Sequence, residues 1–165
     1  MITNVDVYFA IAEEALAESE RLEKLARRPK PDGDPGVIVT YDPERKSFKN
    51  SLVAIVFAGM YLDALFYILG AKQFRKAQYN KKHNNKSLEE KLPLFGLSDK
   101  DLLAEAKRFR KRRRELVHEK AVQISDLTVD TIYIAQEEAK KALSLVKKVT
   151  EKLAHIIPPD GQEVA

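Results

Sequence analysis

Residues 47–69 read SFKNSLVAIVFAGMYLDALFYIL, and this stretch decides the fold. Its length and apolar character suit either a membrane-spanning helix or the central helix of a helical protein. Asp63 favours the second interpretation, because a carboxylate near the middle of a span costs about 2.5 to 3.5 kcal/mol on insertion scales. The neighbouring segments are amphipathic and need an apolar surface to cover. The sequence therefore predicts a central core helix and no association with a membrane.

The segment before the central helix predicts a second long helix followed by a loop. Over residues 4–28, apolar residues recur at steps of three and four, which is the spacing of one helix face. Pro29 and Pro31 end this helix, because proline lacks a backbone N–H and clashes with the preceding turn. Residues 29–43, PKPDGDPGVIVTYDP, are expected to form a loop that is locally extended over 37–41.

The segment after the central helix predicts two further long helices. Residues 70–98 form a basic connection in which Gly70 is the expected C-cap of the central helix and Ser87 opens a short helix. A third long helix starts near Asp99, and a last one runs from Thr128 or Asp130 to about Ala154. The fold class is therefore all-α, an antiparallel bundle of four long helices with an extra short helix. It forms a single domain over residues 1–157, and residues 158–165 are a C-terminal tail.

The composition is that of one globular domain of 165 residues, 44% of them hydrophobic and 33% charged. The absence of cysteine excludes disulfides and cysteine-ligated metal sites and suits a reducing compartment. The chain begins with an acidic segment that does not resemble a secretory signal, so we expect a cytoplasmic protein. It has no HExxH, no phosphate-binding glycine loop and no nucleophile elbow, and its histidines lie far apart. We expect neither a metal nor another cofactor.

A run of cations at 107–114, KRFRKRRR, gives the protein a candidate surface for a polyanion. Each phosphate that a cation neutralises releases counterions and adds affinity without sequence preference, so RNA is the expected partner. The candidate RNA-binding residues are Lys107, Arg108, Arg110, Lys111 and Arg112. The basic connection could extend this surface, with Phe74 and Tyr79 stacking on bases, or it could be a solvated linker with packed aromatic rings.

Arg113 falls on the apolar side of the third long helix. At about 100° per residue it lies near the centre of a stripe of apolar side chains. These are Leu102, Ala106, Phe109, Leu116 and Val117. A guanidinium in that position requires an acceptor, and we expect Asp63 to provide it. The pair could equally be structural, fixing the register of two helices without any chemistry.

His118 is the candidate for proton transfer. On an ideal α-helix it projects about 140° away from Arg113 and lies among other cations. Such neighbours favour the neutral imidazole, which can accept a proton near neutral pH. An incidental exposed histidine is the alternative interpretation.

The six residues from Arg113 to His118, RRELVH, resemble the Arg-x4-His motif of the HEPN superfamily, whose members are bundles of four or five helices. The order of the expected elements is similar over most of the chain. It comprises a long first helix, an apolar second helix carrying an acidic residue, a basic connection and a third helix that ends in the motif. Arg114 departs from the family, in which the residue after the arginine is typically asparagine.

The resemblance implies metal-independent cleavage of RNA, in which the ribose 2′-hydroxyl attacks the adjacent phosphate. His118 would be the general acid or base, Arg113 would stabilise the transition state, and Asp63 and Arg114 would support them. It also implies a homodimer with a composite site, and a toxin or defence effector that could have an antitoxin as protein partner. The alternatives are a non-catalytic helical module that binds RNA or a protein, and a purely structural interaction protein.

Overall fold

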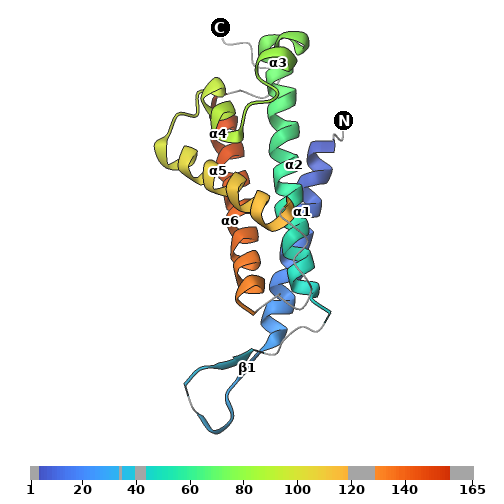
Figure 1. Cartoon of the computed structure of the whole chain (residues 1–165), viewed down its shortest axis with the longest axis vertical. Helices are drawn as coiled ribbons and strands as arrows, with labels where there is room; N and C mark the ends of the chain where they lie inside the picture. The colour runs from blue at the N-terminus through green and yellow to red at the C-terminus, as the bar shows by residue number, and fades with distance from the viewer. Residues whose placement is uncertain (1–3, 34, 40–43, 119–128, 157–165) are drawn as a thin grey trace.

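Four long helices and a small hairpin make up most of the described chain, which comprises residues 4–33, 35–39, 44–118 and 129–156. Figure 1 shows this computed structural model of the protein. The long helices are α1 (Asn4–Ala26), α2 (Lys46–Phe74), α5 (Lys100–Arg113) and α6 (Val129–Ile156). The predicted all-α class is confirmed. The expected C-terminal tail, 158–165, lies outside the described residues.

A short hairpin joins α1 to α2. α1 ends two residues earlier than predicted, because strand β1 (Arg27–Pro29) pairs antiparallel with strand β2 (Val37–Val39). The 3₁₀ turn η1 (Pro31–Gly33) lies between the two strands, and Gly36, with φ of 120°, adopts a backbone conformation that favours glycine. The expected extended stretch is present over 37–39, and the remainder of it lies outside the described residues.

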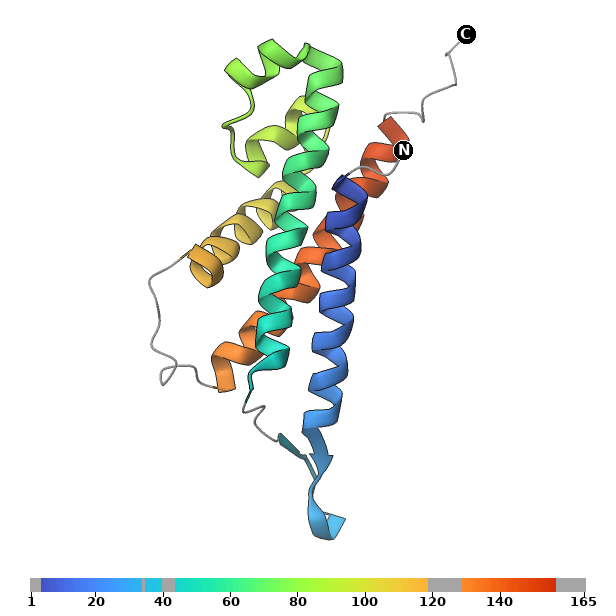
Figure 2. The ribbon, with the colours of Figure 1, turned by 90° about the vertical axis from the view of Figure 1, so that its right-hand side faces the viewer.

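Small side chains allow α1 and α2 to run side by side along most of α1 (Figures 1 and 2). The buried residues at this contact include Ala12 and Ala15 of α1 and Ala54 and Ala58 of α2. Three serines add a buried polar contact in which Ser19 Oγ lies 2.8 Å from Ser51 Oγ and 3.1 Å from the carbonyl oxygen of Ser47. Because these hydroxyls bond one another, their burial carries little desolvation penalty.

α6 closes the core against α2 and also contacts α1 and α5. Its buried face consists of alanine, leucine and valine at helical spacing, namely Ala135, Ala139, Ala142, Leu143, Leu145, Val146, Val149 and Leu153. Tyr61 of α2 reaches Thr150 of α6, with 3.0 Å between the two hydroxyl oxygens. In Figure 2, α1 and α5 run downward and α2 and α6 run upward, and α5 crosses α2 obliquely.

The upper end of α2 differs from the prediction. Gly70 does not end the helix, which continues to Phe74, where Arg75 with φ of 62° reverses the chain into α3 (Lys76–Lys82). Gly70 is needed for close packing instead, because a Cβ there would lie 2.1 Å from Cε2 of the buried Tyr79 ring. Residues 70–86 were expected to form a helical tail leading into a loop, and they instead contain the end of α2 and the folded-back α3 as a second short helix.

The predicted short helix is α4 (Leu88–Lys91), which is followed by the 3₁₀ turn η2 (Leu92–Phe95). Glu90 accepts hydrogen bonds from the backbone N–H of Ser87 at 2.8 Å and from its hydroxyl at 2.6 Å, which fixes the start of α4. Asp99 caps α5 by accepting from the N–H groups of Asp101 and Leu102. The third long helix therefore begins where the sequence placed it.

α2 is less buried than a central core helix would be. By length and composition α2 is able to cross a membrane, although the core helix of a soluble protein can have the same length and composition. In its most apolar window of 18 residues, 39% is buried inside the protein. Its uncovered side borders a groove of about 480 Å³ with α1. Tyr8 of α1 and Met60, Ala64, Tyr67 and Ile68 of α2 provide the apolar lining of this α1/α2 groove.

Candidate functional site

α5 changes its helical geometry at the predicted motif. The α-helix ends at Arg113, and Arg114–His118 continues as a π-helical turn, η3. Backbone hydrogen bonds in a π-helix join residues five apart, whereas those of an α-helix join residues four apart. Position 118 therefore follows Arg113 by one π turn. The angle between the two positions around the helix axis is smaller than the 140° expected for an ideal α-helix. The side chain of His118 itself lies outside the described residues.

Arg113 contacts Asp63, as the sequence predicted. Its Nη1 atom lies 3.4 Å from Oδ2 of Asp63, at the long end of the hydrogen-bonding range. The pair is not buried as expected, since the Asp63 side chain is 57% exposed and that of Arg113 is 25% exposed. The reason is that α1 and α5 leave the Asp63 side of α2 open to solvent. The attraction between the two groups is consequently screened by water.

Gly59 allows the guanidinium of Arg113 to lie directly on the backbone of α2. A Cβ at position 59 would be 2.4 Å from both Cζ and Nη1 of Arg113, closer than carbon atoms approach one another. The Nε atom of Arg113 is buried and has no hydrogen-bond partner among the described residues. A buried N–H without a partner is uncommon, and it marks the guanidinium as packed against α2 at the cost of one hydrogen bond.

Lys91 of α4 was not anticipated from the sequence. Only 7% of its side chain is exposed, and its Nζ atom lies 3.8 Å from Oδ1 of Asp63. This distance is within ion-pair range but is too long for a hydrogen bond. Asp63 thus lies between two cations from different helices, Arg113 and Lys91. Its carboxylate offsets part of the cost of burying the lysine.

A pocket of about 220 Å³ lies between α2, α4 and α5 and contains this arginine. Gly59, Leu62, Leu88 and Phe109 contribute its apolar lining, and Asp63, Lys86, Ser87, Arg110 and Arg113 contribute its polar lining. Three of the lining side chains are cations and one is a carboxylate, so the lining has a net positive charge. Lys86 contributes to this charge without an ion pair among the described residues, and the pocket can accept an anionic group such as a phosphate. We call it the Arg113 pocket.

Arg110 is held at the rim of the Arg113 pocket by Glu89 of α4. Its Nη2 atom lies 2.7 Å from Oε1 of Glu89, and its Nε atom lies 3.1 Å from Oε2. Partial burial alone would raise the pKa of Glu89, but hydrogen bonds from Arg110 and from the backbone, together with the charge of Arg110, lower it. The bidentate pair joins α4 to α5 and fixes the geometry of the rim.

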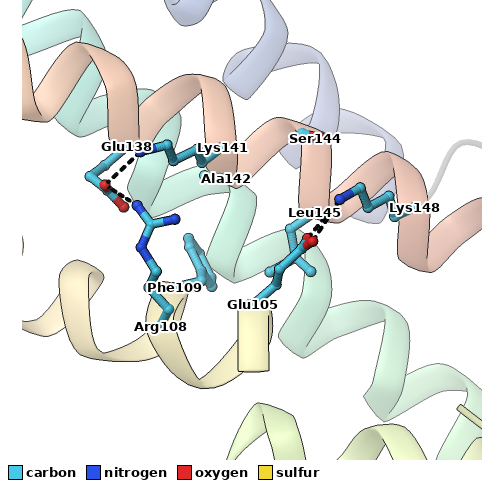
Figure 3. A pocket seen from close by; sticks show the side chains of 9 residues that line it. All are labelled: Glu105, Arg108, Phe109, Glu138, Lys141, Ala142, Ser144, Leu145 and Lys148. Carbon is cyan, nitrogen blue, oxygen red and sulfur yellow. Dashed lines mark hydrogen bonds and ion pairs between the residues drawn. The ribbon is translucent and has the colours of Figure 1, made fainter. Parts of the chain in front are cut away.

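Most of the other candidate RNA-binding residues on α5 also engage carboxylates. Arg108 pairs with Glu138 of α6, Arg112 lies 2.8 Å from Glu115, and Lys111 lies 3.8 Å from the same residue. Figure 3 shows Arg108 reaching across to Glu138, with Glu105 and Lys148 forming a second link between α5 and α6. These links surround a pocket of about 170 Å³. They hold α5 on α6 and reduce the positive charge of the predicted face.

Lys107 and Arg114 differ from these residues. Both are exposed, and neither forms an ion pair within the described part of the chain. They remain able to contact a phosphate without first losing a carboxylate.

Tyr79 of the basic connection does not have the stacking role that was one of its two expected alternatives. Tyr79 is fully buried, and Phe74 packs against it and against His83, with ring centroids 6.4 Å and 5.0 Å apart. Burial raises the pKa of Tyr79, and the negative charge of Asp63 adds to this effect. The interpretation as packed aromatic rings is therefore correct for Tyr79, because folding α3 back over Gly70 encloses its ring.

No family model, curated protein or solved structure matches this chain. Among the described side chains, no group of three or more His, Cys, Asp or Glu residues could hold a metal ion. Sequence reasoning missed Gly59, Lys91 and Glu89, whereas Lys86 belongs to the basic connection that was expected to extend the cationic surface. A usable signal existed for Gly59, since a glycine inside an apolar helix, one turn before the lone aspartate, often marks a close approach. No comparable signal distinguished Lys91 from a surface lysine.

Proposed function

We propose that this chain is a HEPN-like, metal-independent endoribonuclease with an antiparallel bundle of four long helices. The observation that carries the proposal is the position of Arg113 in a pocket of net positive charge, one π turn before His118. The motif therefore begins at a pocket that suits a phosphate. π-helical turns inside α-helices occur frequently at functional sites, which agrees with this assignment.

The proposed reaction needs only groups that the chain supplies. The ribose 2′-oxygen attacks the adjacent phosphorus, the bond from phosphorus to the 5′-oxygen breaks, and the products carry a 2′,3′-cyclic phosphate and a 5′-hydroxyl. His118 removes the proton from the 2′-hydroxyl or donates one to the 5′-oxygen, and water, or His118 of the second copy in the proposed dimer, carries out the other proton transfer. Arg113 stabilises the negative charge that develops on the phosphate oxygens. Asp63 positions Arg113, and the exposed Arg114 contacts a neighbouring phosphate.

The proposal includes a homodimer that uses the α1/α2 groove. This groove is apolar and borders Asp63, so a second copy seated there would lie beside the Arg113 pocket. The apolar side chains that line the groove are only half-buried, and this supports the location, because a partner would remove their remaining surface from water. By the same resemblance we propose a toxin or defence effector of the cytoplasm, which an antitoxin could neutralise.

Cleavage of a labelled RNA in EDTA tests the proposed function. We expect wild type to cut and to leave cyclic-phosphate ends, and we expect Arg113→Ala and His118→Ala to lose cleavage by about 100-fold or more, the usual range for general acid–base groups and for donors that stabilise a transition state. Arg21→Ala and His155→Ala are matched controls, because both side chains are exposed and lie far along the chain from the motif. All variants are first checked by circular dichroism for an intact helical fold.

A non-catalytic module that binds RNA or a protein is the second candidate. The Asp63 contact of Arg113 and the ion pairs along α5 favour it, since they also explain these residues as elements that fix helix register. Binding of RNA by wild type without any cleavage, and with the same behaviour in both motif variants, would select this candidate over the nuclease.

A further inference from the structure

Most cations around α3 form no ion pair among the described residues, whereas most cations of α5 contact a carboxylate. Residues 64–88 contain no Asp or Glu, and six cations fall within this stretch. Four of them are exposed and form no ion pair within the described residues, and we call these the α3 cations: Arg75, Lys76, Lys81 and Lys82. A polyanion can neutralise them without displacing a carboxylate.

α5 presents the opposite case. Arg108, Arg110 and Arg112 each contact a glutamate at hydrogen-bonding distance or closer. A phosphate that approached these arginines would have to replace an existing ion pair, so its net gain would be small. The sequence of α5 therefore contains more cations than can bind RNA without losing a carboxylate partner. Around α3, by contrast, most cations can bind RNA without such a loss.

The helix α3, which carries three of these cations and directly follows Arg75, lies on the same side of α2 as α4 and α5, which border the Arg113 pocket. In Figure 2, α3, α4 and α5 all lie on one side of α2, opposite α1. From Gly59 to Phe74 the α2 axis advances by about 20 Å, at 1.5 Å per residue. Lys86 follows α3 in the chain and lines the pocket itself. Cations are therefore present both at the end of α2 and at the Arg113 pocket.

We propose that the α3 cations and Lys86 bind the phosphate backbone of RNA and lead the strand into the Arg113 pocket. This inference rests on the proposed function, of which it defines the substrate-binding surface. The binding is independent of sequence, because the nearby rings are packed inside the protein and the cations meet phosphates only. A membrane surface fits less well, since residues 72–86 include no exposed large hydrophobic side chain to insert.

Binding of an uncleavable 2′-O-methyl RNA across a range of salt concentrations tests the inference. The variant is Lys76→Gln, Lys81→Gln, Lys82→Gln, and the matched control is Lys24→Gln, Lys30→Gln, Lys49→Gln, which removes the same charge from exposed positions elsewhere. Log affinity decreases as log salt increases, and we expect this negative slope to become shallower by about 2 in the α3 variant. Each phosphate contact to a single strand contributes about 0.7 to its steepness. The control should keep the wild-type slope.

Cleavage is measured separately with a long RNA and with a dinucleotide that reaches only the pocket. We expect the α3 variant to cut the long RNA less well and the dinucleotide as well as wild type does. Equal slopes in wild type and the α3 variant would overturn the inference, as would equal losses in the α3 variant and the control. Competition by polyglutamate or anionic vesicles as strong as by RNA of equal charge would also overturn it. If the slope falls as expected but wild type cuts nothing, the proposed nuclease fails while the binding surface stands.

Discussion

At the scale of single residues, the Arg113 pocket depends on the absence of a side chain at position 59. The guanidinium occupies the space that a Cβ would take, and its buried Nε has no partner among the described residues. The nearby charges are arranged so that Asp63 lies between Arg113 and Lys91. Two substitutions probe these contacts without removing Arg113 itself.

Gly59→Ala should displace the Arg113 guanidinium while leaving the helix intact. Alanine favours a helix over glycine by about 1 kcal/mol, and the partly exposed arginine can swing outward, so we expect an unchanged or higher melting temperature. RNA cleavage should fall toward the level of Arg113→Ala. Thermal unfolding and cleavage assays on the same preparation check both results, and wild-type cleavage in a folded variant would contradict the role of this position.

Gly70→Ala is the informative control, because it adds the same methyl group to the same helix. Its Cβ would meet the buried ring of Tyr79, which cannot move aside, so we expect overpacking to cost about 1 to 3 kcal/mol. The melting temperature should therefore fall for Gly70→Ala and not for Gly59→Ala.

Lys91→Met tests whether the buried lysine serves stability. Methionine has a similar length and no charge. Removing one member of an ion pair is costly mainly when the other member is left buried without a counter-charge, whereas Asp63 is 57% exposed. In this variant Asp63 would still contact Arg113 and would still be hydrated. We expect the free energy of unfolding, measured by urea denaturation, to stay within about 1 kcal/mol of wild type or to increase. A loss of several kcal/mol would show that the lysine charge itself stabilises the fold.

At the scale of helices, the short α4 is held against α5 by the Glu89–Arg110 pair. Hydrogen bonds and the charge of Arg110 lower the pKa of Glu89 in the folded protein despite its partial burial. α5 in turn gives way to a π-helical turn at Arg114, which changes the direction in which the motif residues project. The local geometry of the candidate site is therefore set by contacts between elements.

Glu89→Gln should lower stability at neutral pH and have little effect in acid. A carboxylate whose pKa is lower in the folded state stabilises the fold above its unfolded pKa, and this contribution is lost as the pH falls through the folded value. We expect a difference of about 1 kcal/mol at pH 7, typical of a hydrogen bond to a charged group at a partly exposed site. It should shrink as the pH drops below the ordinary value of 4.5. Urea denaturation across the pH range measures it, with Glu14→Gln as an exposed control that should show no such trend.

At the scale of the whole molecule, one side of α2 is covered by the other long helices and another side is open. The open side forms the α1/α2 groove beside Asp63. A second copy of the chain at this groove would bury apolar surface and bring two Arg113 pockets near one another. The oligomeric state is thus the global property on which the proposed composite site depends.

Ala64→Arg should weaken the proposed dimer. The substitution places a long, charged side chain in the apolar groove, where a partner would have to bury it without a counter-charge. We expect sedimentation velocity to show a dimer for wild type and a monomer for the variant, with lower RNA cleavage at equal protein concentration. Ala17→Arg, at an exposed position of α1, should leave both unchanged. A wild-type protein that is monomeric at all concentrations would contradict the dimer.

The sequence by itself determined the helical class, the positions of the long helices and the contact between Asp63 and Arg113, because apolar periodicity, prolines and caps act locally and one helix offered a lone carboxylate. Only the tertiary structure decided that Gly59 and Gly70 serve close approaches, that Tyr79 is enclosed, and that Lys91 is buried beside Asp63. It also decided which cations are neutralised, since Arg108 and Arg110 meet glutamates 30 and 21 positions away along the chain. Charge and apolar pattern are properties of a segment, whereas burial and pairing depend on which segments the fold brings together.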